Sequence, residues 1–539
     1  MDKRRFVRLV CIICAVCACV FDLGAGNKPD EKEPEIRIEF EQPGAVYLKN
    51  ERIKVAVEID DPSTTVLRIE MLDVDMKTIG KPTYLKKKDA GSSSFDYEFK
   101  ERELGYYYLK ITDENSGKSA QEGFGVIPDV RLTKKDWDSP FGICGHYQRY
   151  KDWRVGDVQQ KLGIAWVRDE ADWQGVAQKG LARDPYLEYL NSKNICWLAL
   201  FNYVNSYNGV QGADSIWKWD EDVSMIKEYV KKHKGDFHVY ESQNEPNNFG
   251  GWSKRWPHPQ NQQWRPHGWG KPFADLIKQM HDSIKAIDPT LKLMWPGEEE
   301  WIEYFVEERG AAPYIDVTCI HPYVNKGKYP ETSSFANGEG YKEMRDELSR
   351  LKVPTEIWAT ELGWSTYKTD GEPERYMPVT EVEQAAFLWR SYLLHLYNGA
   401  EKVFWYEMVD EDFGAENPES YFGLLRFNSK ITVKPAAVAY SNLIHNYRHA
   451  KVLGRFFDRE VYGFAYSNKG NSQLCLWTEK ESKNITLNLK KTKQLILTDI
   501  FGREKKLKVE NGTVHINVGF SPLTIKGIDK RDMEGLYIP

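Results

Sequence analysis

Apolar and polar residues alternate along the first part of the chain after residue 35. Runs such as 53–59 and 106–111 place apolar residues at every second position, and turn residues separate the runs. A period of two is that of a strand with one buried face. Several short strands at this spacing predict an N-terminal immunoglobulin-like β-sandwich over residues 36–128.

The pattern then changes to strand-like runs that alternate with helix-like stretches. The strand-like runs are 141–144, 165–168, 196–201, 237–241, 291–295, 315–320, 356–360 and 402–406. Helical stretches between them include 223–232, 273–287, 341–351 and 381–397. Eight strand–helix units predict a closed (β/α)8 TIM barrel over residues 137–448. An open dinucleotide-binding sheet is disfavoured because no GxGxxG follows the first strand.

Strand character returns after residue 449. The runs 474–477, 485–489, 494–497 and 514–518 predict a C-terminal antiparallel β-domain over 449–530, with a turn at 499–502. The predicted fold class is therefore α/β, with a TIM barrel between an N-terminal β-sandwich and a C-terminal antiparallel β-domain.

The N-terminus has the pattern of an export signal. Residues 1–8 are basic, 9–21 are apolar and 24–26 are small. The apolar run is short for a membrane span, so we interpret residues 1–26 as a signal peptide. The protein is then secreted, periplasmic or on the cell surface. A lipoprotein signal is the alternative, and membrane attachment is expected only if Cys19 is lipidated.

Composition narrows the function classes. A chain of 539 residues is too long for a single hydrophobic core, so more than one domain is expected. Its content of 41% hydrophobic and 29% charged residues is ordinary for a globular protein. A net charge of −6 argues against nucleic-acid binding. Beyond the signal, the cysteines are far apart, with no CxxC or Cys/His cluster, so we expect no metal site and buried free thiols. They are Cys144, Cys196, Cys319 and Cys475.

Two glutamates follow predicted barrel strands directly. Glu245 lies in the segment Asn244-Glu-Pro246 after the fourth strand, and Glu361 follows the seventh strand just before Gly363. The carboxyl ends of barrel strands are where TIM barrels carry their chemistry. Two carboxyl groups facing one pocket can cleave a glycosidic bond, one as acid and one as nucleophile. The alternative for either glutamate is a solvated position on the rim.

Residues beside the two glutamates suit the same chemistry. The Asn244 amide could bond the sugar hydroxyl next to the reacting carbon, although Asn before Glu-Pro is also common in turns. His321 and Tyr323 follow the sixth strand, and a Tyr323 hydroxyl donated to Glu361 would hold that carboxylate ionised and oriented. A histidine satisfied within the barrel is the alternative for His321.

Three further residues stand at predicted strand ends. Trp405 would lay its indole against a sugar face, with barrel core as the alternative. Arg168 would add positive potential beside Glu361, and an ion pair with Asp169 or Glu170 is the alternative. His146 is a candidate lining residue of the pocket.

The segment after Glu245 alternates tryptophans with basic residues. Trp252 and three later tryptophans are interleaved with Lys254, Arg255 and others, which would suit stacking subsites for a glycan, including one with carboxylate or sulfate groups. Collapse of the loop onto its own aromatics is the alternative. The acidic run 298–300 is read as a helix start and not as a metal site.

The motifs together resemble clan A of the glycoside hydrolases, most closely family 39, with family 5 cellulase-like enzymes second. The resemblance rests on Asn244-Glu-Pro246, His321-Pro-Tyr323, Glu361 and Trp405, and it covers about 140–448. It implies a retaining double displacement with Glu245 as acid/base and Glu361 as nucleophile. By position it also implies that Asn244, His321, Tyr323 and Trp405 contact the sugar.

We therefore expect a secreted retaining glycosidase that acts on a poly- or oligosaccharide and needs no cofactor. A non-catalytic carbohydrate-binding protein on a barrel scaffold and a transglycosylase are the alternatives. The sugar, the linkage, endo or exo action and the oligomeric state are open.

Overall fold

The computed structural model describes residues 36–61, 63–86, 94–101, 103–147, 153–202, 219–246, 270–296, 301–324, 329–368, 378–427, 431–456 and 460–538. Its N-terminal domain consists of two sheets. One holds β1 (Ile36–Phe40), β3 (Arg52–Ile59) and β6 (Ser94–Lys100); the other has the order β2 (Val46–Leu48), β8 (Ser119–Ile127), β7 (Gly105–Asp113), β4 (Val66–Asp73), β5 (Thr78–Lys86). Residues from both sheets, such as Val55 and Leu109, share one apolar core. The predicted sandwich is confirmed.

Eight parallel strands close into a barrel, as predicted. They are β9 (Phe141–Cys144), β10 (Trp166–Glu170), β11 (Cys196–Phe201), β12 (Val239–Ser242), β13 (Lys292–Trp295), β14 (Val317–Ile320), β15 (Ile357–Leu362) and β16 (Lys402–Trp405), and β16 pairs with β9. Most strand residues are buried, because helices cover the outside and side chains fill the inside. The fourth strand ends at Ser242, which places Glu245 three residues beyond it.

Helices surround the barrel. They are α2 (Arg154–Leu162), α3 (Trp173–Gln178), α4 (Pro185–Ser192), α5 (Trp219–Lys232), α7 (Gly270–Lys285), α8 (Ile302–Arg309), α9 (Glu339–Leu351), α10 (Glu381–Asn398) and α11 (Pro435–Tyr447). Short 3-10 turns are η4 (Ala312–Tyr314), η5 (Pro330–Thr332) and η6 (Pro418–Tyr421), and a hairpin joins β17 (Leu425–Phe427) to β18 (Ile431–Val433). Thr380 and Glu383 form a capping box that starts α10, and Gly399 in a left-handed conformation ends it.

The C-terminal domain is built on a seven-stranded sheet. Its strands are β24 (Glu504–Lys508), β23 (Gln494–Thr498), β26 (Leu523–Ile528), β21 (Asn471–Trp477), β20 (Tyr462–Asn468), β19 (Lys451–Phe456) and β27 (Tyr537–Ile538), in that order. A second pair joins β22 (Lys483–Asn488) to β25 (Thr513–Val518). The sheet extends beyond residue 530, because α12 (Lys530–Met533) returns the chain so that β27 pairs with β19.

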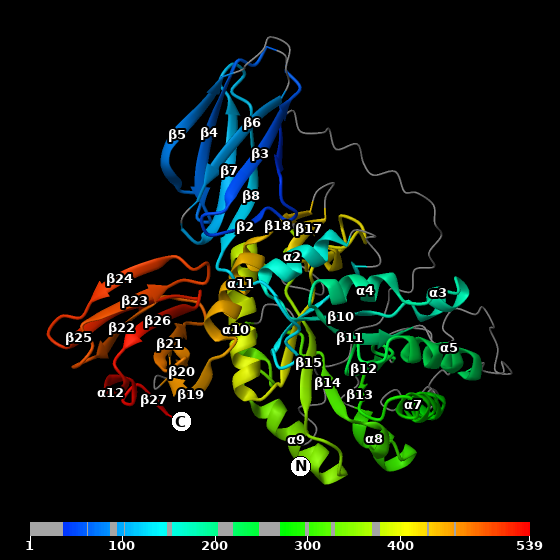
Figure 1. Cartoon of the computed structure of the whole chain (residues 1–539). Coiled ribbons are helices and arrows are strands. Elements are labelled where there is room, and N and C mark those ends of the chain that lie inside the picture. The colour runs from blue at the N-terminus through cyan, green and yellow to red at the C-terminus, as the bar shows by residue number, and fades with distance from the viewer. Residues whose placement is uncertain are drawn as a thin grey trace.

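Both β-domains flank the barrel near α10 and α11 (Figure 1). The Tyr106 hydroxyl donates to the Val433 carbonyl oxygen at 3.1 Å, and Gly125 packs so closely on Val438 that a Cβ there would lie 2.4 Å from Cγ2. The N-terminal β-domain thus packs directly against β18 and α11.

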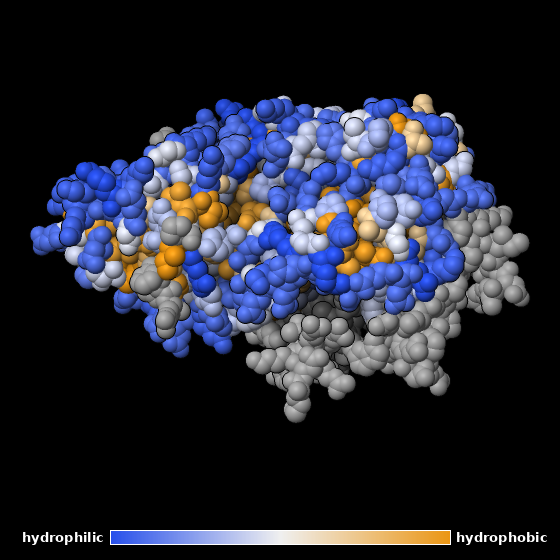
Figure 2. Space-filling model, turned by 90° about the horizontal axis from the view of Figure 1, so that it is seen from below, coloured by the Kyte–Doolittle hydropathy of each residue, from blue (hydrophilic) through white to orange (hydrophobic). Residues whose placement is uncertain are grey.

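The outer surface is mainly hydrophilic, with separate hydrophobic areas, in the view of Figure 2. Large exposed hydrophobic side chains are spread over all three domains: Met76, Ile79, Tyr84, Phe413, Val452 and Ile538. Among the described helices, none is long and apolar enough to cross a membrane.

Candidate active site

The two predicted glutamates meet at the carboxyl-terminal end of the barrel. Glu245 follows β12 and Glu361 is in β15, so they come from strands that are three places apart in the ring of eight. One oxygen of each carboxyl group and one His321 nitrogen all lie within 4.8 Å of one another. Glu245 has a positive φ of 37°, an uncommon conformation for a residue with a side chain, and such positions cluster at functional sites. The geometry makes this pair the chemical centre of the rim.

Arg168 makes hydrogen bonds to Glu361 and to a second glutamate, Glu241. Its Nη1 donates to Glu361 Oε1 at 2.6 Å, and its Nε and Nη2 donate to the two oxygens of Glu241 at 2.6 and 2.8 Å. Burial works to lower the pKa of Arg168, but the charges of Glu241 and Glu361 outweigh it and raise that pKa well above its usual value. Arg168 therefore supplies a permanent positive charge next to Glu361, as predicted, and its partners are not Asp169 or Glu170.

Asn244 is oriented by the same guanidinium. Arg168 Nη2 donates to Asn244 Oδ1 at 2.7 Å. Because a guanidinium carries only donors, the oxygen of the amide must face it. The amide nitrogen has no partner among the described residues, so it is the group that remains to donate to a ligand hydroxyl. Asn244 is partly exposed, which leaves room for this contact.

His321 links the two glutamates. Its Nδ1 lies 2.5 Å from Glu245 Oε1 and 3.7 Å from Glu361 Oε2, and its Nε2 lies 3.1 Å from Thr360 Oγ1. Burial tends to lower the pKa of His321, but the negative charge of Glu361 and the hydrogen bonds to Cys319 and Glu245 raise it well above the usual value. The Glu245–His321 pair therefore holds a proton at neutral pH.

Tyr323 completes the environment of Glu361, as predicted. Its hydroxyl donates to Glu361 Oε2 at 3.0 Å. Burial and the charge of Glu361 raise the pKa of Tyr323 well above its usual value, so the phenol stays a donor. With Arg168 on one oxygen and Tyr323 on the other, Glu361 is held in one orientation.

Trp405 does not face this centre, contrary to the sugar contact expected for it. Its side chain is fully buried and stacks on Trp364, with ring centroids 5.7 Å apart. Side chains alternate along a strand, and Phe404 stacks on Trp358, so Trp405 must point the other way. The next residue, Tyr406, is half-buried and meets Tyr323 edge-on at 6.3 Å. Sequence reasoning missed Tyr406, although the alternation of side chains along the strand could have indicated that Tyr406, and not Trp405, faces the site.

His146 lies in a second charged cluster, beside Tyr406. Its Nδ1 lies 2.6 Å from Glu411 Oε1 and 3.1 Å from Glu407 Oε2, and its ring meets Tyr406 at 6.0 Å. Burial and the charge of Glu411 raise the pKa of Glu407 well above its usual value. His146 thus lies on the rim next to the ring of Tyr406. Sequence reasoning missed Glu407 and Glu411, although Glu407 directly follows the eighth predicted strand.

Trp252 and the other tryptophans of its loop lie outside the described residues, as does the acidic run 298–300. Cys144, Cys196, Cys319 and Cys475 are buried and free, as predicted. Burial raises the pKa of Cys196 and of Cys475 to about 12, so both are protonated at neutral pH.

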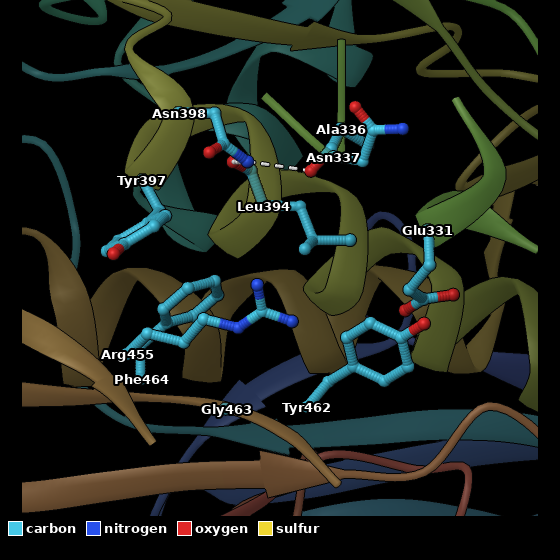
Figure 3. Close-up of a pocket in the computed structure, with 10 residues that line it drawn as sticks. All are labelled: Glu331, Ala336, Asn337, Leu394, Tyr397, Asn398, Arg455, Tyr462, Gly463 and Phe464. Atoms are coloured by element: carbon cyan, nitrogen blue, oxygen red, sulfur yellow. Dashed lines mark hydrogen bonds between the residues drawn. The ribbon is translucent and has the colours of Figure 1, made fainter. Parts of the chain in front are cut away.

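A pocket of about 170 Å³ lies elsewhere, between the barrel and the C-terminal domain (Figure 3). It is lined by residues such as Glu331 of η5, Tyr397 of α10 and Arg455 of β19. Glu331 is already bound by Arg390 and by Trp477 Nε1 at 2.7 Å. Neither Glu245 nor Glu361 lines this pocket, so it is separate from the candidate active site at the rim.

Comparison with known proteins identifies the architecture. No family model and no curated protein matches the chain. A solved family 39 glycoside hydrolase from the gut symbiont Bacteroides cellulosilyticus WH2 is 21% identical, with a TM-score of 0.70 over 92% of this chain and 100% of that chain. This likeness shows that the two chains share one fold.

Two other solved structures match at lower TM-scores. An α-L-arabinofuranosidase from Thermotoga maritima is 14% identical over 69% of this chain and 89% of that one, with a TM-score of 0.44. A β-glucuronidase from Bacteroides uniformis is 11% identical over 90% of this chain and 73% of that one, with a TM-score of 0.36.

Proposed function

We propose that this protein is a glycoside hydrolase that cleaves O-glycosidic bonds of an oligo- or polysaccharide with retention of anomeric configuration. The observation that carries the proposal is the short separation of Glu245 and Glu361 oxygens, within 4.8 Å. Retaining enzymes hold their two carboxyl groups about 5–5.5 Å apart, and inverting enzymes leave about 6.5–9.5 Å for a water. The fold shared with a family 39 glycoside hydrolase supports the same assignment.

The two carboxyl groups have distinct environments that suit distinct roles. Glu361, which accepts hydrogen bonds from Arg168 and Tyr323, attacks the anomeric carbon. Glu245, which shares a proton with His321, donates it to the leaving oxygen as the glycosidic bond breaks. Glu245 then takes a proton from water, the water oxygen attacks the anomeric carbon, and the bond to Glu361 breaks. Each step uses only groups of the chain, sugar and water.

Asn244 and Tyr406 are placed to contact the reacting sugar. The free amide nitrogen of Asn244 would donate to the hydroxyl beside the anomeric carbon, a bond that strengthens in the transition state. The Tyr406 ring lies beside Tyr323 and would pack against a face of the sugar, which the fully buried ring of Trp405 cannot do. A signal peptide at residues 1–26 and export of the enzyme remain part of this proposal.

The principal test replaces the nucleophile. Glu361→Ala should abolish hydrolysis of the 4-nitrophenyl glycoside that the wild-type protein cleaves best in a panel of such sugars. Sodium azide should restore turnover, because azide fills the space of the lost carboxylate and attacks from the same face. The product should be a glycosyl azide of the opposite anomeric configuration to the substrate, identified by NMR.

Wild-type protein with azide is the control and should give only the free sugar. Full activity of Glu361→Ala would exclude Glu361 as nucleophile. Binding of glycans by wild-type protein, without turnover of any, would favour the non-catalytic alternative. Transfer to added acceptor sugars in preference to water would favour the transglycosylase.

A further inference from the structure

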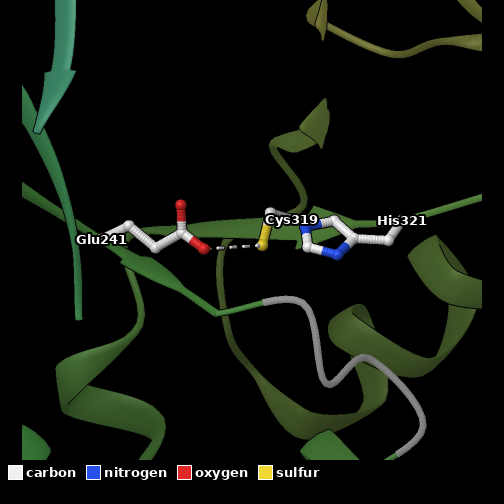
Figure 4. A group of neighbouring side chains, drawn as sticks. All are labelled: Glu241, Cys319 and His321. Atoms are coloured by element: carbon white, nitrogen blue, oxygen red, sulfur yellow. Dashed lines mark hydrogen bonds between the residues drawn. The ribbon is translucent and has the colours of Figure 1, made fainter. Parts of the chain in front are cut away.

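Glu241 is a buried carboxylate that the reaction described above does not use. It belongs to β12, its side chain is fully buried, and it lies four residues before Glu245. Its two oxygens accept from Nε and Nη2 of Arg168 in a bidentate pair. Cys319 Sγ approaches one of these oxygens only at 4.0 Å, as Figure 4 shows. Glu241 therefore makes its close contacts with Arg168.

The bidentate pair fixes the direction of the remaining guanidinium edge. A guanidinium is planar and rigid, so binding at Nε and Nη2 sets where Nη1 points. Nη1 lies 2.6 Å from Glu361 Oε1, and the second proton of Nη2 reaches Asn244 Oδ1 at 2.7 Å. One carboxylate thus governs the placement of two residues of the site through a single arginine.

The negative charge of Glu241 also affects the electrostatic potential at Glu361. One positive charge on Arg168 faces two carboxylates, Glu241 and Glu361, in a buried cluster. At Glu361, the negative charge of Glu241 opposes the positive charge of Arg168, so the net positive potential on the attacking group is smaller than Arg168 alone would give. Without Glu241, the charge of Arg168 would act on Glu361 without that opposition.

We propose that Glu241 is a positioning residue that holds Arg168 on the nucleophile and limits how far Arg168 neutralises it. This inference rests on the proposed function. The charged or titratable groups that surround Glu361 are Arg168, Glu241, Glu245, His321, Tyr323, Cys144, Tyr406 and Glu407. Of these, only Glu241 acts on Glu361 through the opposite edge of its arginine.

The test follows inactivation by a 2,4-dinitrophenyl 2-deoxy-2-fluoro-glycoside of the sugar that wild-type protein cleaves. This probe traps the nucleophile and needs no acid help. Glu241→Gln should lower the inactivation rate about 100-fold, the loss that a misplacement of about 1 Å can cause. It should also move the acid limb of the pH profile lower by about one pH unit, because Arg168 then favours the carboxylate form of the nucleophile more strongly.

Glu331→Gln is the matched control. Glu331 is likewise buried and pairs bidentately with an arginine, Arg390, but at the interface with the C-terminal domain. It should lower thermal stability and leave the acid limb in place. Glu241→Asp, which keeps the charge on a shorter arm, should lower the rate with the limb unmoved, and it serves as the test if Glu241→Gln does not fold.

An acid limb of Glu241→Gln at the wild-type position or at higher pH would overturn the proposal, as would an unchanged rate in Glu241→Asp. Failure of the proposed function looks different: wild-type protein would cleave no glycoside and would carry no label on Glu361.

Discussion

In the proposed mechanism, the proton held between Glu245 and His321 is the one donated to the leaving group. Their atoms lie 2.5 Å apart, and the raised pKa of His321 means that the pair releases its proton only as the pH rises through that raised value. The leaving oxygen needs this proton, so kcat/KM of the wild-type protein should fall on the alkaline side. Glu361 needs no proton, and its hydrogen bonds to Arg168 and Tyr323 serve the attack.

Glu245→Ala separates these roles. With a poor leaving group, kcat/KM should fall about 10²–10⁴-fold, the usual contribution of acid catalysis. With a 2,4-dinitrophenyl leaving group, kcat/KM should stay near the wild-type value and lose its alkaline limb, because that leaving group departs without a proton. The measurement is kcat/KM against pH for both substrates. Equal losses on both would contradict an acid role for Glu245.

Individual site residues were predictable where a strand-end motif marked them. Glu245, Glu361, His321 and Tyr323 all come together as expected, because each lies at or just beyond the carboxyl end of a barrel strand. Glu241 carried no such mark, since a glutamate inside a strand gives no sign that a buried arginine from another strand will face it. Pairings between strands depend on register, which one sequence does not reveal.

At the scale of elements, the alternation of side chains along β16 decides which aromatic residue faces the candidate active site. Lys402 and Phe404 belong to the inner face, since Lys402 lies over the rings of Trp166 and Trp358 and Phe404 stacks on Trp358. Trp405 is then directed to the layer of helices, where it stacks on Trp364 beside α10. Residue type alone favoured Trp405, and position on the strand favours Tyr406.

Paired substitutions test this correction. Tyr406→Ala should lower kcat/KM about tenfold to a hundredfold, corresponding to about 1.4–2.7 kcal/mol of transition-state binding. Trp405→Ala should destabilise the fold by about 3–5 kcal/mol through the cavity it leaves. Its kcat/KM per folded molecule should change little. Chemical denaturation and steady-state kinetics measure the two effects, and a larger kinetic loss in Trp405→Ala would restore the original assignment.

At the scale of the whole molecule, the fold class followed from periodicity. Eight strand–helix alternations predict a closed barrel, because each parallel strand needs a crossover helix. The flanking β-domains also followed from alternation, but in the C-terminal domain β19, β20, β24, β26 and β27 were not among the predicted runs. Of these, β24 has the sequence Glu-Lys-Lys-Leu-Lys and β27 has only two residues. Highly charged and very short strands carry little hydrophobic signal, and only pairing partners in the folded chain define them.

The stereochemistry of the first-formed product tests the central claim most directly. Proton NMR of a cleaved aryl glycoside, recorded before the free sugar mutarotates, distinguishes the two anomers. One oxygen of Glu245 and one of Glu361 lie within 4.8 Å of each other, which matches the separation of about 5–5.5 Å in retaining enzymes, so the account predicts the same anomeric configuration as the substrate. Release of the opposite anomer would contradict it.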